Sequence, residues 1–273
     1  MKTLQNQTLL YDKDCPLCNV YTRGFIKAKM LDSNGRKAYC DLNNDEQHFI
    51  DLQRATNEIA LFDTNNKTVI YGIDSLLRVI GNSMPWVEKI GNLKPVKLGL
   101  KKLYSFISFN RKVIIPNKED SSQKLQCVPD FNYKYRYIYI LIATLITSLV
   151  LFNFSRMISI IPESNFLREC LIALGQIGFQ ALFISKLKSD KQINYLGNLM
   201  TVSLMGSLFL IPVLIINSFF VIPEIALLAW FGLTVTLMLL EHLRRVKILE
   251  LPKYLSATWL LYRVVVLLLI LSL

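Results

Sequence analysis

The chain has 273 residues, of which 52% are hydrophobic and 19% are charged, and its mean hydropathy is +0.36. This composition excludes a disordered chain and a collagen-like repeat, and it favours membrane segments. Five cysteines are too few for a disulfide-stabilised scaffold. A formal net charge of +11 suits an anionic membrane surface or nucleic acid. Because of the apolar excess, we expect membrane lipid as a partner and no nucleic acid.

The first part of the chain, residues 1–90, is predicted to be a small α/β domain. Apolar runs and turn signals predict elements in the order β-α-β-α-β-β-α. The expected strands cover residues 8–11, 37–42, 59–62 and 68–71, and the expected helices cover residues 16–31, 45–56 and 73–80. This element order resembles the core of a thioredoxin-like fold.

Cys15-Pro16-Leu17-Cys18 directly follows the first expected strand and opens the first expected helix. Backbone N–H groups and the helix dipole at this position stabilise a thiolate, so we expect Cys15 to be a nucleophile at neutral pH. Cys18 is close enough in sequence to resolve a mixed disulfide on Cys15. The disulfide between them is the only redox group that the sequence implies, and we expect no separate cofactor.

Two other interpretations of the pair remain open. A CxxC motif can form half of a zinc site, and Cys40 and His48 are then the candidates for the remaining ligands. Their spacing is irregular and no second CxxC follows, so no metal is our expectation. The pair can also be structural and unreactive. Cys40, at the end of the second expected strand, is interpreted as a buried apolar residue.

The sequence from Tyr11 to Cys18 resembles the opening motif of the DCC family of thiol-disulfide oxidoreductases, Asp-x-x-Cys-x-x-Cys, matched here by Asp12, Cys15 and Cys18. Residues 69–77 are similar to the family's second block, in which a strand leads into Gly-x-Asp-Ala and a helix. The resemblance covers residues 8–90 and implies a thioredoxin-like fold with thiol-disulfide oxidoreductase activity. Lys13 departs from the family, which has glycine there.

Three carboxylates accompany these motifs. Asp12 is a candidate catalytic residue that accepts a proton during exchange if burial raises its pKa, and the alternative is that it fixes the turn. Asp14 is expected to cap the first helix. Asp74, in the second block, is expected to cap the helix over residues 73–80. Residues 56–59 lack the proline that faces the dithiol in thioredoxins.

The second segment, residues 91–134, is a basic amphipathic stretch followed by a polar linker. Residues 89–118 contain eight Lys or Arg and no acid, with apolar residues between them. We predict an interfacial segment on the anionic cytoplasmic leaflet, with a helix packed on the domain as the alternative. The linker covers residues 116–129 and includes Cys127, to which we assign no role.

The third segment, residues 135–273, is predicted to be an all-α membrane domain. Five apolar stretches have the length that crosses a bilayer, namely residues 135–154, 166–185, 199–222, 224–242 and 254–273. Lys and Arg concentrate in the loops on one side, which predicts a cytoplasmic N-terminus and an outside C-terminus. The first ten residues do not resemble a signal peptide. We expect an integral protein of an inner or cytoplasmic membrane.

Arg263 and Gln176 are the candidate functional residues inside the spans, because a charge at mid-span is costly and usually faces a partner or a cavity. Gln176, a backbone carbonyl or Glu169 is the expected partner of Arg263, and a purely structural contact is the alternative. Cys170 is the only cysteine in the spans, which argues against a disulfide relay across the membrane. Glu241 and His242 are interpreted as ordinary interface residues.

These patterns together predict a membrane-tethered thiol-disulfide oxidoreductase whose dithiol faces the cytoplasm and reacts with a protein or small-thiol partner. The alternative is a membrane transport or assembly protein. Its N-terminal domain would then be a non-catalytic module for binding, redox sensing or metal binding.

Overall fold

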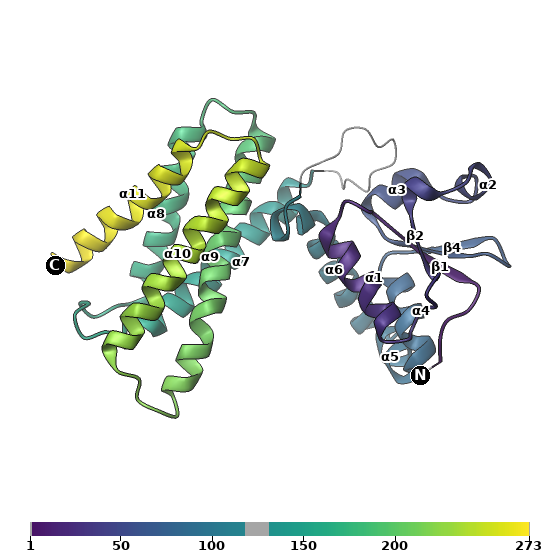
Figure 1. The fold of residues 1–273 in the computed structure, drawn as a ribbon, viewed down its shortest axis with the longest axis horizontal. Helices are drawn as coiled ribbons and strands as arrows, with labels where there is room; N and C mark the ends of the chain where they lie inside the picture. Colours follow the sequence, from purple (N-terminus) through teal and green to yellow (C-terminus); the bar gives the residue numbers. More distant parts are fainter. Residues whose placement is uncertain (1, 118–130, 273) are drawn as a thin grey trace. The chain divides into compact units, whose positions relative to one another are not determined.

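The computed structural model describes residues 2–117 and 131–272, and the chain forms two compact units, Met1–Asn132 and Tyr133–Leu273 (Figure 1). Cys127 and most of the predicted linker lie outside the described residues. The strands are β1 (Gln7–Tyr11), β2 (Arg36–Ala38), β3 (Ala60–Asp63) and β4 (Thr68–Tyr71). The helices of the first unit are α1 (Pro16–Lys27), α2 (Asn44–Gln47), α3 (Leu52–Asn57), α4 (Ile73–Ser83), α5 (Pro85–Gly91) and α6 (Lys94–Ile114).

The four strands form one mixed sheet in the order β2-β1-β3-β4. Strand β1 pairs in parallel with β2 and antiparallel with β3, and β3 pairs antiparallel with β4. A parallel pair needs a crossover, which α1 supplies, whereas the antiparallel β3–β4 pair is joined by a short turn. The predicted α/β fold of thioredoxin-like element order is therefore confirmed.

Strand β1 is buried on both faces. Successive side chains of a strand point to opposite faces, so Leu9 and Leu10 enter two different clusters. Leu9 packs with Leu61 and Val79 on one face, and Leu10 packs with residues of the opposite face that include Tyr39 and Ile50. This double burial explains why the sequence of β1 is a continuous apolar run instead of an alternating pattern.

Two elements differ from the predictions: the second expected helix is divided into two helices, and the second expected strand is shorter. The helix expected over residues 45–56 is split into α2 and α3, because the Asp51 side chain accepts a hydrogen bond from the Arg54 N–H at 3.0 Å and caps a new helix. Strand β2 ends at Ala38, and a 3₁₀ turn, Tyr39–Asp41, follows it. Cys40 lies on this turn and is exposed, so the prediction that it is buried was wrong.

Gly72 connects β4 to α4 in a conformation that other residues rarely adopt. Its φ is +65°, and an added Cβ would lie 2.9 Å from Glu58 Oε2. Gly72 is also the N-cap of α4, so Asp74 does not cap this helix as predicted. The Asp74 carboxylate instead pairs with Lys97 of α6, 2.7 Å from Nζ to Oδ1.

Helix α6 packs along the domain through two bonds to backbone groups. The Ile59 N–H donates to the Tyr104 hydroxyl at 2.8 Å, and the Ser108 hydroxyl donates to the Asn57 carbonyl at 2.6 Å. Tyr104 also packs against the cluster that contains Leu9. The opposite side of α6 is exposed and both apolar and basic, with Leu98, Lys102 and Leu103.

The second unit consists of five helices: α7 (Tyr133–Ser155), α8 (Phe166–Ile184), α9 (Ser189–Asn217), α10 (Glu224–Ile248) and α11 (Tyr254–Leu271). All five are long and apolar enough to cross a membrane, as the sequence predicted. Figure 1 shows them side by side, in teal through green to yellow.

Buried polar contacts explain why α9 begins ten residues before the predicted span. Asn194 and Asn198 in its first turns accept hydrogen bonds from Arg136 at 3.0 Å and from Arg245 at 2.8 Å. His242 is also buried, and its ring nitrogens are bonded to the hydroxyls of Tyr195 and Ser256. The interpretation of His242 as an ordinary interface residue was therefore wrong.

The double burial of β1 yields a stability prediction. Leu9→Ala should lower the free energy of unfolding of the N-terminal domain by about 2–5 kcal/mol, because it leaves a cavity in a closed cluster. The measurement is proteolysis of the full-length protein in detergent across a urea series, followed on N-terminal fragments. Val20→Ala, at an exposed position of α1, should change the free energy of unfolding by less than about 0.5 kcal/mol. Equal losses in the two variants would contradict the packing described here.

Candidate functional site

Cys15 is the N-cap of α1, and its sulfur replaces the oxygen that serine or aspartate usually supplies there. Its Sγ accepts a hydrogen bond from the Cys18 N–H at 3.4 Å. Pro16 occupies the first helical position, where an N–H is not needed. Asp14, predicted to be the cap, lies one residue before the N-cap. The strand–loop–helix geometry thus brings Cys15 and Cys18 together at the end of the sheet.

Both cysteines are in the dithiol form and are buried, with 8% of Cys15 and 4% of Cys18 exposed. The neighbouring Cys18 side chain and burial raise the pKa of the Cys15 thiol, while the Cys18 N–H and the charge of Arg111 act in the opposite direction. The net shift of the Cys15 pKa in this dithiol is upward, and a thiolate on Cys15 at neutral pH stays a prediction. The N–H group at the helix N-terminus favours the Cys15 thiolate, but burial and the Cys18 side chain raise the pKa of Cys15 by more.

Asp12 shapes the loop that leads to the dithiol. Its Oδ1 accepts a hydrogen bond from the Asp14 N–H at 2.9 Å, and its carbonyl accepts one from the Cys15 N–H at 3.2 Å. Burial raises the pKa of the Asp12 carboxyl, against the opposing effects of the Asp14 N–H and the charge of Arg111. Lys13 has no positive φ, so the family's glycine can be replaced here without backbone strain.

The end of α6 contributes residues to this site that sequence reasoning assigned to the membrane surface. Arg111 is buried, with 6% of its surface exposed, and its charge acts on both Asp12 and Cys15. Just beyond α6, the Asn117 side-chain amide donates to the Asp14 carbonyl. The sequence spacing could have indicated this role: Arg111 follows Tyr104 by seven residues, which places both side chains on the same face of α6.

Tyr21 is a second site residue that the sequence did not single out. A side-chain hydrogen bond joins it to Cys18, and burial, with the charge of a Cys18 thiolate, raises the pKa of its hydroxyl. It follows Cys18 by three residues, so the two lie on the same face of α1. Thr22, one residue further, donates from its hydroxyl to the Cys18 carbonyl at 2.7 Å.

The structure brings none of the other predicted metal ligands to the dithiol. Within residues 2–117 and 131–272, no three His, Cys, Asp or Glu side chains are grouped so as to hold a metal ion. Cys40 is exposed on its turn, and Cys170 lies on α8 in the second unit. The arrangement around Cys15 and Cys18 is suited to two-electron exchange between a dithiol and a disulfide.

Arg263 and Gln176 both line a cavity inside the helical unit. Arg263 does not bond to any of the three partners expected for it. Its guanidinium donates to the Ser203 hydroxyl at 3.4 Å and lies over the Trp259 ring at 4.2 Å. Glu169 also lines this cavity and is paired with Arg168.

Removal of the Arg111 charge gives a pH prediction. Because that charge lowers the pKa of the Cys15 thiol, Arg111→Gln should move the alkylation profile of Cys15 to higher pH and slow its alkylation several-fold at pH 8. The rate is measured by peptide mass spectrometry on the full-length protein, with the exposed Cys40 as internal reference. Lys102→Gln, exposed on the same helix, should leave the profile unchanged. Identical profiles for Arg111→Gln and the unmodified protein would show that the charge does not act on Cys15.

Comparison with known proteins gives one match. Residues 9–115 match the family model of the DCC1-like thiol-disulfide oxidoreductases. The matched region runs from β1 to the residue after α6 and contains Asp12, Cys15, Cys18 and Arg111. No curated protein and no solved structure is matched by the chain. The chain therefore carries a DCC1-like thiol-disulfide oxidoreductase domain at residues 9–115, followed by five long apolar helices.

Proposed function

We propose that the protein is a membrane-tethered enzyme that exchanges the Cys15–Cys18 dithiol with the disulfide of a protein or small-thiol partner on the cytoplasmic side. The observation that carries this proposal is the Cys15 sulfur at the N-cap of α1, with Cys18 one turn along the helix. The family match supports the class of chemistry.

The exchange proceeds in two displacements. The Cys15 thiol loses its proton and attacks one sulfur of the partner disulfide, which forms a mixed disulfide and releases a partner thiolate that takes up a proton. Cys18 then loses its proton and attacks the Cys15 sulfur, which releases the second partner thiol and forms the Cys15–Cys18 disulfide. Two electrons pass to the partner, and the enzyme is left oxidised. A second dithiol must reduce it again.

Cys15 is the better candidate for the attacking thiol. It is the more exposed of the two, and its sulfur faces the backbone donor at the helix N-terminus. Asp12 precedes it in the same loop, and its raised pKa suits a group that accepts the Cys15 proton and returns it to the leaving thiolate.

The membrane role has two supports. Five helices can cross a membrane, and the Lys and Arg residues of their loops lie on the side expected for a cytoplasmic N-terminus. The exposed side of α6 carries Leu98 and Leu103 among lysines, a composition that suits the anionic surface of the inner leaflet. The helices would then retain the dithiol at the membrane.

A trapping experiment tests the exchange. In Cys18→Ser, the mixed disulfide on Cys15 has no resolving thiol, so glutathione disulfide should leave a persistent glutathione adduct on Cys15, detected by peptide mass spectrometry. Cys15→Ser should give no comparable adduct on Cys18, which is more buried. Both variants are made in a Cys40→Ser background to remove the exposed thiol.

Equal adducts in the two variants would contradict the assignment of Cys15 as the attacking thiol. A pair that alkylates only after a chelator is added would favour a metal-binding module over an oxidoreductase.

The orientation is tested with a membrane-impermeant maleimide on intact cells. Cys40, exposed on the domain, should be labelled only after permeabilisation. A cysteine introduced by Glu163→Cys, at an exposed position between α7 and α8, should be labelled in intact cells. The reverse labelling pattern would place the dithiol outside and contradict the proposal.

A further inference from the structure

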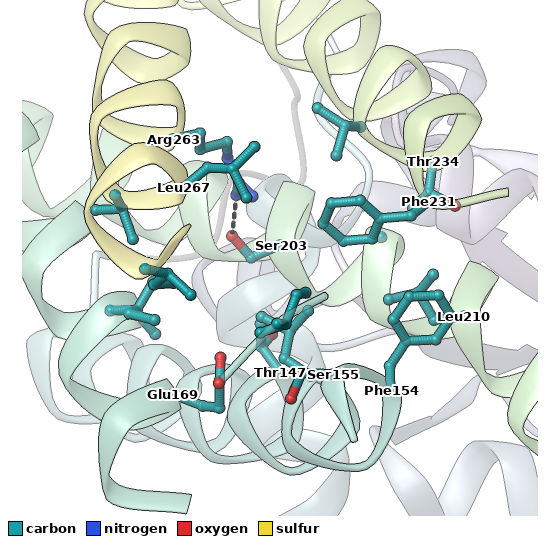
Figure 2. Close-up of a pocket in the computed structure, with 18 of the residues that line it drawn as sticks. Thr147, Phe154, Ser155, Glu169, Ser203, Leu210, Phe231, Thr234, Arg263 and Leu267 are labelled. Atoms are coloured by element: carbon teal, nitrogen blue, oxygen red, sulfur yellow. Dashed lines mark hydrogen bonds between the residues drawn. The ribbon is translucent and has the colours of Figure 1, made fainter. Parts of the chain in front are cut away.

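The five-helix unit contains a partly open cavity of about 400 Å³ that is lined by residues of all five helices (Figure 2). This volume falls within the range of roughly 300–1,000 Å³ typical of small-molecule sites. The walls are mostly apolar, and those shown include Phe154, Leu210, Phe231 and Leu267. The cavity is therefore large and apolar enough to hold an alkyl chain.

Arg263 places a positive charge in this apolar space. Figure 2 shows its side chain extending from α11 towards Ser203 of α9. The bond to the Ser203 hydroxyl, at 3.4 Å, is at the long limit for a hydrogen bond, and the buried Nε has no hydrogen-bond partner among the described residues. The face of the Trp259 ring is the other favourable contact described for the guanidinium.

No carboxylate of the described part of the chain neutralises this charge. The ion pairs of the helical unit join Glu169 to Arg168, and Glu241 to Arg244 and Arg245. Glu169 lines the same cavity, but it is held by Arg168 at 2.9 Å and by the Ser164 hydroxyl at 2.6 Å. A charge in an apolar cavity without a counter-ion is costly, so an anion in the cavity would be stabilising.

Gln176 provides an independent polar group in the same cavity. Only 4% of its surface is exposed, and neither its side-chain nitrogen nor its oxygen has a hydrogen-bond partner in residues 2–117 and 131–272. Buried amides of this kind are normally bonded. The amide N–H, like the guanidinium N–H groups, requires an acceptor.

We propose that the cavity binds a long-chain carboxylate, whose head is held by Arg263, Gln176 and Ser203 and whose alkyl chain lies along the apolar walls. This ligand site is independent of the dithiol chemistry. A carboxylate carries one negative charge, which matches the single guanidinium, and its two oxygens can accept from that guanidinium and from the amide at once. A neutral carbonyl or hydroxyl would leave the charge uncompensated, and a phosphate would bring more charge than the site can balance.

The test measures binding of radiolabelled palmitate to the full-length protein in detergent. Saturable binding at about one molecule per chain is expected. Hexadecanol, which has the same chain without the charge, and decylubiquinone, a neutral carbonyl compound, should compete at least tenfold less well than unlabelled palmitate. Equal competition by hexadecanol would show that only the chain is recognised, and stronger competition by decylubiquinone would show a quinone site. Either result would overturn the proposal.

Variants locate the site. Arg263→Gln and Gln176→Leu should each weaken palmitate binding, the former by about tenfold or more, as expected for loss of a charged hydrogen-bond donor. Leu267→Trp should block binding by filling the cavity, whereas Leu261→Trp, exposed on the same helix, should bind like the unmodified protein. Unchanged binding in Arg263→Gln and Leu267→Trp would place palmitate elsewhere and overturn the assignment.

Two controls separate the possible causes of a loss. The competition series uses the unmodified protein, so it decides on the carboxylate even if Arg263→Gln fails to fold. The double variant Cys15→Ser, Cys18→Ser should bind palmitate normally, so failure of the dithiol function and failure of this site give different results.

Discussion

The burial of β1 on both faces is the constraint on which the rest of the domain depends. A shift of one residue in its pairing would exchange Leu9 and Leu10 between two different clusters, so the register of the strand is fixed. The end of the strand at Tyr11 is thereby fixed too. A short loop then brings Cys15 to the start of α1. The position of the sulfur at the helix terminus is thus a consequence of packing at the centre of the sheet.

Helix α6 connects this packing to the electrostatics of the dithiol. Tyr104 and Ser108 bind backbone groups just before β3, and one turn further Arg111 is buried with its charge acting on Asp12 and Cys15. Two opposing effects therefore meet at Cys15: burial beside Cys18 favours the protonated thiol, and the Arg111 charge with the helix terminus favours the thiolate. Their net effect is an upward shift of the pKa of the Cys15 thiol.

The sequence predicted those parts whose pattern is local. Apolar runs located the strands, the CxxC motif located the helix start, and long apolar stretches located the spans. It did not predict features that depend on distant contacts. Amphipathic periodicity cannot tell a membrane surface from a protein surface, so the docking of α6 was only the alternative interpretation, and the role of Arg111 was missed. The buried environment of His242 likewise depends on Tyr195 and Ser256 from two other helices.

The contacts of α6 differ in what they require of their partners. Tyr104 and Ser108 bind main-chain groups of Ile59 and Asn57, so side-chain replacements at those two positions leave both bonds intact. Asp74 and Lys97 depend on each other's charge. During evolutionary divergence, the first pair of contacts can therefore persist without correlated substitutions, whereas the ion pair should be gained, lost or reversed as a unit. Covariation between homologous sequences would thus reveal only part of this helix's attachment.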